Sequence, residues 1–165
     1  MKNFSLVIGA IAFLSLNTAS GQGLNNFATL YIETGAVLTV KDDFKNNTSS
    51  TVNNAGTITV SGDFDNSGTP TIASILEFDG SGAQTVSGNT RIPDVLVVNK
   101  SGGVATVASG TTEIDGILRL AEGTMNANGN VVITAYDIDL AGYLNTGSGS
   151  LRVVGSSTSQ TVGIG

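Results

Sequence analysis

The stretch LTVKDDFKNN, residues 38–47, decides the fold because a close echo of it, ITVSGDFDNS, follows at residues 58–67. The two stretches begin twenty residues apart, and both combine β-branched residues with a Phe and a polar turn. A short internal period of this kind is typical of a solenoid in which every repeat is one turn of the chain. The echo therefore predicts a stacked β-structure.

The period continues along the chain as a series of apolar dyads, each made of two large apolar residues around one further residue. The dyads are Leu38/Val40, Ile58/Val60, Leu76/Phe78, Leu96/Val98, Leu118/Leu120 and Ile138/Leu140. Alternation with a period of two is typical of a half-buried strand, and clusters of Gly, Asn, Asp and Ser between the dyads indicate turns.

A coil of about twenty residues cannot bury its own apolar face, but it can do so when stacked on a neighbour. We therefore expect an all-β fold, a right-handed parallel β-helix with six or seven coils of about 20 residues. The side chains expected to meet across the first two coils are Phe44 with Phe64, Lys45 with Asp65, and Asn46 with Asn66. An antiparallel β-sandwich is the alternative, since turns every 8–12 residues fit it too; the near-constant dyad spacing favours the solenoid.

The first residues have the pattern of a bacterial signal peptide. Lys2 is followed by the apolar run Leu6–Leu16 and then by small residues. We expect residues 1–21 to be the signal peptide, with cleavage between Gly21 and Gln22. The apolar run is shorter than the roughly 20 residues that a membrane-spanning helix needs, which disfavours an anchor. The sequence thus predicts a secreted, extracellular or outer-surface protein whose residues 22–165 form one β-solenoid repeat domain.

Composition excludes several classes of function. The 165-residue chain has a net charge of −6, only 7 Lys and Arg, and neither His nor Cys. Nucleic acids and anionic membranes require clustered basic residues, so we expect neither as a partner. Without His or Cys, the chain has no His-based triad, no His zinc site and no thiol nucleophile. We predict no enzymatic activity and no cofactor.

Carboxylates are the remaining candidates for chemistry, namely Asp43, Asp63, Asp65, Asp137 and Asp139. Paired carboxylates can bind Ca²⁺ or serve glycoside hydrolysis. Ca²⁺ needs six to eight oxygen ligands, however, and apart from Lys45 next to Asp65 the repeat places no base or cation beside these acids. We interpret them as turn and surface acids and assign no catalytic, cofactor-binding or metal residue; Ca²⁺ binding at Asp43, Asp63 and Asp65 is left open.

Two further patterns have a structural and a functional interpretation. Tyr31, Tyr136 and Tyr143 can stack on sugar rings if they are exposed, but their positions in alternating strands favour the core or its edge. Thr39 and Thr59 resemble the start of an ice-binding Thr array. The equivalent position in the next coil is Glu77, so ice binding is disfavoured.

A second echo joins residues 76–88, LEFDGSGAQTVSG, to residues 151–163, LRVVGSSTSQTVG. It suggests that a larger unit begins again near the end of the chain. The chain stops at Gly165, inside that unit and without the polar cap that a solenoid end requires. We therefore expect a fragment truncated at its C-terminus.

The same residues carry a family resemblance. FDGSGAQTVSG at 78–88, VLVVNKSGGV at 95–104 and GILRL at 116–120 resemble a recurrent unit of large surface proteins exported by bacteria with type IX secretion. The resemblance covers most of residues 36–165 and implies a β-helical, adhesin-like surface protein. It supplies no catalytic residues, and such proteins usually carry a C-terminal sorting domain that is not in this sequence.

The functional expectation is a non-enzymatic, secreted or cell-surface β-solenoid that acts as a stalk or adhesive module. Its expected partners are surface glycans, host or matrix proteins, and further repeats or copies of the chain at the C-terminal coil. One alternative is a carbohydrate-active β-helix that binds or cleaves polysaccharide. Another is the subunit of a self-assembling fibre.

Overall fold

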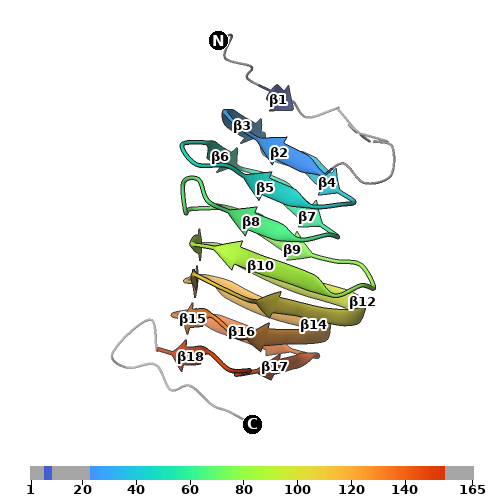
Figure 1. Ribbon diagram of the computed structural model, residues 1–165, viewed down its shortest axis with the longest axis vertical. Helices are drawn as coiled ribbons and strands as arrows, with labels where there is room; N and C mark the ends of the chain where they lie inside the picture. The colour runs from blue at the N-terminus through green and yellow to red at the C-terminus, as the bar shows by residue number, and fades with distance from the viewer. Residues whose placement is uncertain (1–5, 9–22, 155–165) are drawn as a thin grey trace.

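The computed structural model, which describes residues 6–8 and 23–154, shows a β-solenoid of about six turns (Figure 1). Within the described residues, every pair of strands is parallel, and no strand pairs with the strand that follows it in the chain. A sandwich built from hairpins would show antiparallel pairs between consecutive strands. The predicted parallel β-helix is therefore confirmed, and the sandwich alternative is excluded.

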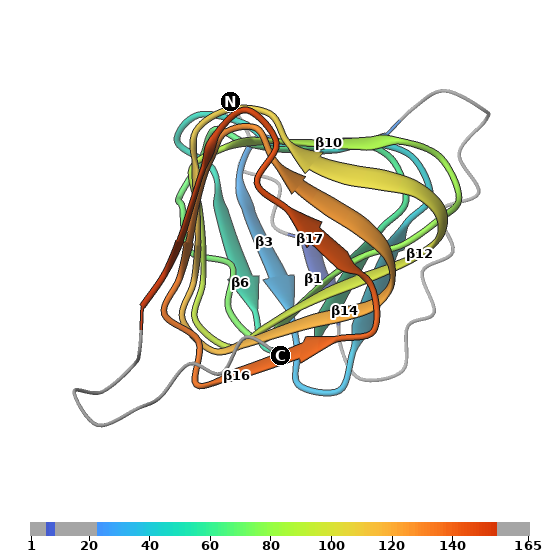
Figure 2. The ribbon, with the colours of Figure 1, turned by 90° about the horizontal axis from the view of Figure 1, so that it is seen from below.

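The turns place strands on three faces, and the coils superimpose when seen along the shaft (Figure 2). The first face contains β1 (Leu6–Ile8), β3 (Thr29–Ile32), β6 (Thr51–Asn54), β11 (Thr90–Ile92), β13 (Thr111–Ile114), β15 (Asn130–Ile133) and β18 (Ser150–Val153). The second contains β4 (Val37–Val40), β7 (Thr57–Val60), β9 (Ile75–Phe78), β16 (Asp137–Leu140) and the first parts of β12 (Val95–Val107) and β14 (Ile117–Ala127). The third contains β2 (Leu24–Asn26), β5 (Phe44–Asn46), β8 (Phe64–Asn66), β10 (Gln84–Gly88), β17 (Tyr143–Asn145) and the remainder of β12 and β14.

The second face carries all six predicted dyads in register. Leu38 pairs with Ile58 and Ile58 with Leu76, and the series continues through β12 and β14 to β16. The first five dyads are buried, whereas Leu140 of the last dyad is 50% exposed. The difference follows from stacking, because no described strand covers the far side of β16.

Aromatic rings form part of the core where the second and third faces meet. Phe44 and Phe64 stack with ring centroids 5.4 Å apart and an interplanar angle of 9°. Phe64 meets Phe78 edge-on at 5.6 Å. The predicted contact between Phe44 and Phe64 is confirmed, and the geometry is one that aromatic pairs favour.

A ladder of buried amides runs along the third face. Asn26 Nδ2 donates to Asn46 Oδ1, and Asn46 Nδ2 donates to Asn66 Oδ1, each over 2.8 Å. The ladder predicted for Asn46 and Asn66 is confirmed and also includes Asn26. It ends at Gly88, the partner of Asn66 in β10, where φ is +82° and an added Cβ would lie 2.1 Å from the Asn66 carbonyl oxygen.

The two sequences of the second echo occupy different faces. Leu76 and Phe78 lie in β9 on the second face, whereas Leu151 and Val153 lie in β18 on the first. The similar sequences therefore do not occupy equivalent positions in the solenoid. The position of β18 is set by its pairing with β15, in which each residue lies twenty residues after its partner. Residues 155–163 of the echo lie outside the described residues.

The predicted signal peptide lies mostly outside the described residues, and so does its cleavage site. Its residues Leu6–Ile8 form β1, which pairs with β3 at the N-terminal edge of the first face. None of the described residues belongs to a helix long and apolar enough to span a membrane.

Candidate functional site

Asp43 and Asp63 stack at one corner of the solenoid, as expected from the repeat. Asp43 Oδ1 accepts a hydrogen bond from the backbone N–H of Asp63 over 2.8 Å. Asp63 Oδ1 in turn accepts one from the backbone N–H of Thr85 over 2.7 Å. Each carboxylate thus binds the backbone of the following coil, which gives both acids a structural role.

Asp65 lies 3.6 Å from Lys45, which confirms the predicted contact between neighbouring coils. Its Oδ1 also accepts a hydrogen bond from Ser67 Oγ over 3.0 Å. Such a partly exposed ion pair contributes about 0–1 kcal/mol. Residues 23–154 contain no cluster of three or more acidic side chains that could hold a metal ion.

The outward column of the second face follows the predicted order. Thr39 pairs with Thr59, and Thr59 with Glu77, so the flat Thr array stops after two coils. Farther along the same face, Asp139 lies 3.5 Å from Arg119 in an exposed ion pair. The column therefore presents mixed side chains.

Lys100 is a residue that the sequence analysis missed. It is 1% exposed, and its Nζ donates to the Asp79 carbonyl over 2.8 Å and to Gln84 Oε1 over 3.1 Å. Burial lowers the pKa of Lys100, while the charge of Asp79 acts in the opposite direction. A signal was present, because Lys100 follows Leu96 and Val98 with the same inward parity.

The expectation that the tyrosines line or edge the core is wrong. Tyr31, Tyr136 and Tyr143 are 40%, 60% and 73% exposed. Tyr31 has an outward position in β3 between Leu30 and Ile32, which are both buried. Alternation that buries the two neighbours necessarily turns the Tyr31 ring outward.

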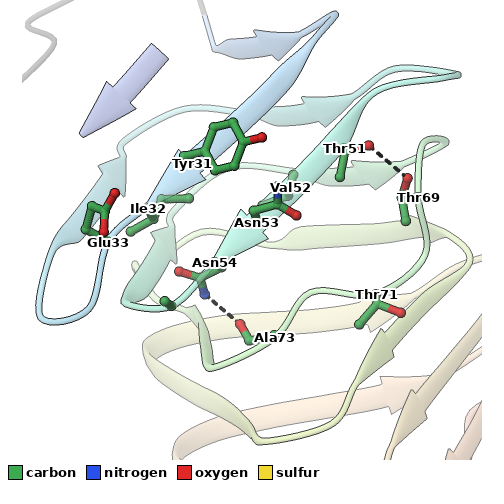
Figure 3. Close-up of a pocket in the computed structure, with 11 residues that line it drawn as sticks. Tyr31, Ile32, Glu33, Thr51, Val52, Asn53, Asn54, Thr69, Thr71 and Ala73 are labelled. Atoms are coloured by element: carbon green, nitrogen blue, oxygen red, sulfur yellow. Dashed lines mark hydrogen bonds between the residues drawn. The ribbon is translucent and has the colours of Figure 1, made fainter. Parts of the chain in front are cut away.

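A hollow of about 400 Å³ lies beside Tyr31 on the first face (Figure 3). We call it the Tyr31 groove; its polar and aromatic lining consists of Tyr31, Glu33, Thr51, Asn53, Asn54, Thr69 and Thr71, with Ile32, Val52, Ala55 and Ala73 as the apolar part. The ring of Tyr31 lies above the neighbouring strand β6, which carries Asn53 (Figure 3).

The groove exists because the sheet of the first face is interrupted after β6. In the next coil Thr71 pairs only with Arg91 on its far side, through an isolated bridge. The segment is tied to β6 at its two ends, where Thr69 N–H donates to the Ser50 carbonyl over 2.9 Å and Asn54 Nδ2 to the Ala73 carbonyl over 2.7 Å. Between these ties, no hydrogen bond among the described residues joins the backbone of Val52 or Asn53 to the next coil.

A second hollow of about 320 Å³ lies on the following coils of the same face. Its lining consists of Pro70, Asn89, Thr90, Arg91, Thr111 and Glu113. Arg91 is already engaged there, with Nε 2.7 Å from Asp115 Oδ2. This hollow thus offers fewer unengaged polar groups than the Tyr31 groove.

The stacked parallel coils define the chain as a β-helical repeat protein. No family model, no curated protein and no solved structure matches the chain.

Proposed function

We propose that the chain is a secreted or cell-surface, non-enzymatic β-solenoid that serves as a stalk or adhesive module. The observation that carries the proposal is the use of Asp43 and Asp63, whose carboxylates bind the backbone of the adjacent coil. The acids with the best sequence signal for chemistry thus hold coils together. The resemblance to adhesin-like repeats from bacteria with type IX secretion supports the same function.

The mechanism is geometric. A buried core that continues from coil to coil makes the shaft stiff, and its outward columns repeat at steps of about 4.8 Å. Many weak contacts along such columns add up to strong attachment when they form together. Surface glycans and host or matrix proteins are the partners that we propose.

Retention of coated beads under flow tests the adhesive function. Beads that carry the secreted chain should stay on surfaces coated with neutral glycans, collagen or fibronectin, whereas beads that carry albumin should wash away. Equal loss of both kinds of bead from every surface would contradict an adhesive role.

A carbohydrate-active β-helix is the competing function, and its test is turnover of an acidic polysaccharide such as polygalacturonate. We expect no product from the wild-type chain. Product formation that disappears in Asp63→Asn and Asp65→Asn variants would replace the adhesive proposal by an enzymatic one.

Self-assembly into a fibre is a second candidate function, favoured by apolar exposure on the last described coil. Leu140, Tyr143 and Val153 are 50%, 73% and 36% exposed there. Their strands each lack a described neighbour on one side, and such strand edges recruit further strands. Sedimentation that speeds up with protein concentration, and slows when Leu140 is replaced by Ser, would favour the fibre over a monomeric stalk.

A further inference from the structure

We propose that the Tyr31 groove binds a short neutral oligosaccharide, with the ring of Tyr31 as the stacking platform. This inference rests on the proposed adhesive function and names the ligand class for one site on the shaft. Four features of the groove carry it: the aromatic ring, the unengaged polar side chains, an open backbone edge and the absence of cationic groups from the lining.

The ring of Tyr31 projects from β3 at an accessible position. Its neighbours Leu30 and Ile32 are 3% and 2% exposed and fix the backbone of β3. The ring makes no stacking contact, and the phenol no hydrogen bond, with any residue in the described part of the chain. An exposed ring on a well-anchored strand suits the apolar face of a sugar ring, while its hydroxyl stays available for a polar contact.

Polar side chains next to the ring are also unengaged. Asn53 is the register partner of Tyr31 in the next coil, and its amide forms no hydrogen bond with a described residue. The same holds for the side chains of Glu33 and Thr71. An amide, a hydroxyl and a carboxylate together supply donors and acceptors for sugar hydroxyls.

The backbone of Val52 adds a separate observation. Thr51 and Ala55 direct their N–H groups toward the preceding coil, where they donate to the carbonyls of Ala28 and Ile32. Directions alternate along a strand, so the N–H and C=O of Val52 face the groove, and neither has a hydrogen-bond partner among the described residues. These backbone groups are therefore open to hydrogen bonds from the groove, which a ligand hydroxyl can supply.

The ties at both ends of the gap disfavour a peptide as the occupant. A peptide that joins a sheet by strand addition needs several consecutive open backbone groups. Here the bonds from Thr69 to Ser50 and from Asn54 to Ala73 close the edge on either side of Val52. A compact ring with hydroxyls around it fits the remaining opening better than an extended chain does.

Charge selects a neutral saccharide. Glu33 is the only charged residue in the lining, and the whole chain carries a net charge of −6. An acidic polysaccharide would be repelled by this field, whereas a neutral one would not. The groove spans the strands from β3 to Thr71, a distance of about 10 Å at 4.8 Å per step, which limits the site to a short oligosaccharide.

The test is an amide-resolved NMR titration of the secreted chain with the neutral hexasaccharides cellohexaose, mannohexaose and xylohexaose. Oligogalacturonate and a valine-rich peptide serve as the acidic and the extended comparator. We expect at least one neutral hexasaccharide to shift the amides of Tyr31, Val52 and Asn53, with an affinity near the millimolar range. Tyr31→Ala should weaken binding at least tenfold. Tyr143→Ala, which removes a more exposed tyrosine from the third face, should bind as the wild type does.

Three outcomes overturn the groove proposal: no neutral hexasaccharide shifts these amides, Tyr31→Ala binds as tightly as Tyr143→Ala, or only the peptide or oligogalacturonate binds. Equal thermal midpoints for the two variants establish that Tyr31→Ala is folded. If only the groove proposal is wrong, beads that carry the chain are still retained on collagen and fibronectin. If the adhesive function itself is wrong, the beads are retained on none of the surfaces. The two proposals can therefore fail independently.

Discussion

Lys100 and Gln84 are hydrogen-bonded inside the core, with Lys100 Nζ donating to Gln84 Oε1 over 3.1 Å. The amide group of Gln84 donates to the carbonyls of Val60, over 3.0 Å, and Gly62. Lys100, Gln84 and the carbonyls of Val60 and Gly62 belong to three successive coils, so this polar group ties the coils together. A polar network in a low-dielectric core is stabilising only while all its members keep their partners.

Removal of the ammonium should therefore destabilise the solenoid. In Lys100→Met the side chain keeps most of its length, but Gln84 Oε1 loses its donor. We expect a loss of about 2–4 kcal/mol in the free energy of unfolding, measured by urea denaturation. Lys41→Met is the matched control, because Lys41 is exposed and forms only a 3.8 Å ion pair with Asp79. Equal effects of the two substitutions would contradict the role of Lys100.

The buried ammonium also predicts a pH dependence. Burial lowers the pKa of Lys100 in the folded chain from its usual 10.5. At a pH between the pKa of the folded chain and that of the unfolded chain, the unfolded chain therefore binds more protons than the folded chain does. The contribution of Lys100 to stability should then rise with pH and fall as the pH drops through the folded pKa. We expect the difference in unfolding free energy between wild type and Lys100→Met to be larger near pH 10 than near pH 8. A smaller difference at the higher pH would show that attraction to Asp79 outweighs burial.

The amide ladder predicts a second destabilising substitution. Asn46→Ala removes the middle of the ladder and leaves the buried amides of Asn26 and Asn66 each without one partner. We expect a cost of about 2–3 kcal/mol, measured by thermal and urea unfolding. Lys45→Ala, on the same strand but with its side chain outward, loses only the ion pair with Asp65 and should change stability by less than about 1 kcal/mol. Similar losses of unfolding free energy in the two variants would mean that the amide ladder does not stabilise the protein.

Two substitutions should instead stabilise the protein. The hydroxyls of Thr90 and Thr112 are buried, stacked in register and without a hydrogen-bond partner among the described residues. Thr90→Val and Thr112→Val remove the unpaired hydroxyl at nearly constant volume, so each should add about 1 kcal/mol to the free energy of unfolding. A loss of stability in calorimetry would indicate that the hydroxyls bind an internal water.

The corner acids predict an insensitivity to metal. Because Asp63 accepts a hydrogen bond from the Thr85 backbone, Asp63→Ala should cost about 1 kcal/mol, and Asp63→Asn, which keeps an acceptor, should cost less. Addition of Ca²⁺ or of a chelator should leave the thermal midpoint of the wild type unchanged. A midpoint that rises with Ca²⁺ and returns with the chelator would assign a calcium site to these acids.

Much of the shaft follows from the twenty-residue period. Once neighbouring coils are aligned by their dyads, the stacking of Phe44 on Phe64 and the contact of Lys45 with Asp65 are consequences of parallel register. The amide ladder follows in the same way, and its extension to Asn26 required only one further step of the period.

The Tyr31 groove depends on a local departure from that period. The dyads at Ile58 and Leu76 are 18 residues apart, the shortest interval in the series, and Pro70 in the same segment lacks a backbone donor. These two signals mark where the ladder after β6 is open, but the periodicity alone does not place Tyr31 beside the gap. Lys100 has a different explanation, because it occupies the inward position after Leu96 and Val98 but, as a charged residue, does not continue the apolar pattern by which core positions are recognised.

Register stacking of the coils underlies each of these inferences, and a disulfide between coils measures it directly. The chain has no Cys, and Thr39 is the register partner of Thr59 but lies two coils from Glu77. Strand neighbours about 4.8 Å apart fall within the range of a disulfide, whereas a separation of about 9.6 Å does not. Mass spectrometry after mild oxidation should show a bond in Thr39→Cys/Thr59→Cys and none in Thr39→Cys/Glu77→Cys. A bond in the second variant, or none in the first, would contradict the stacked solenoid.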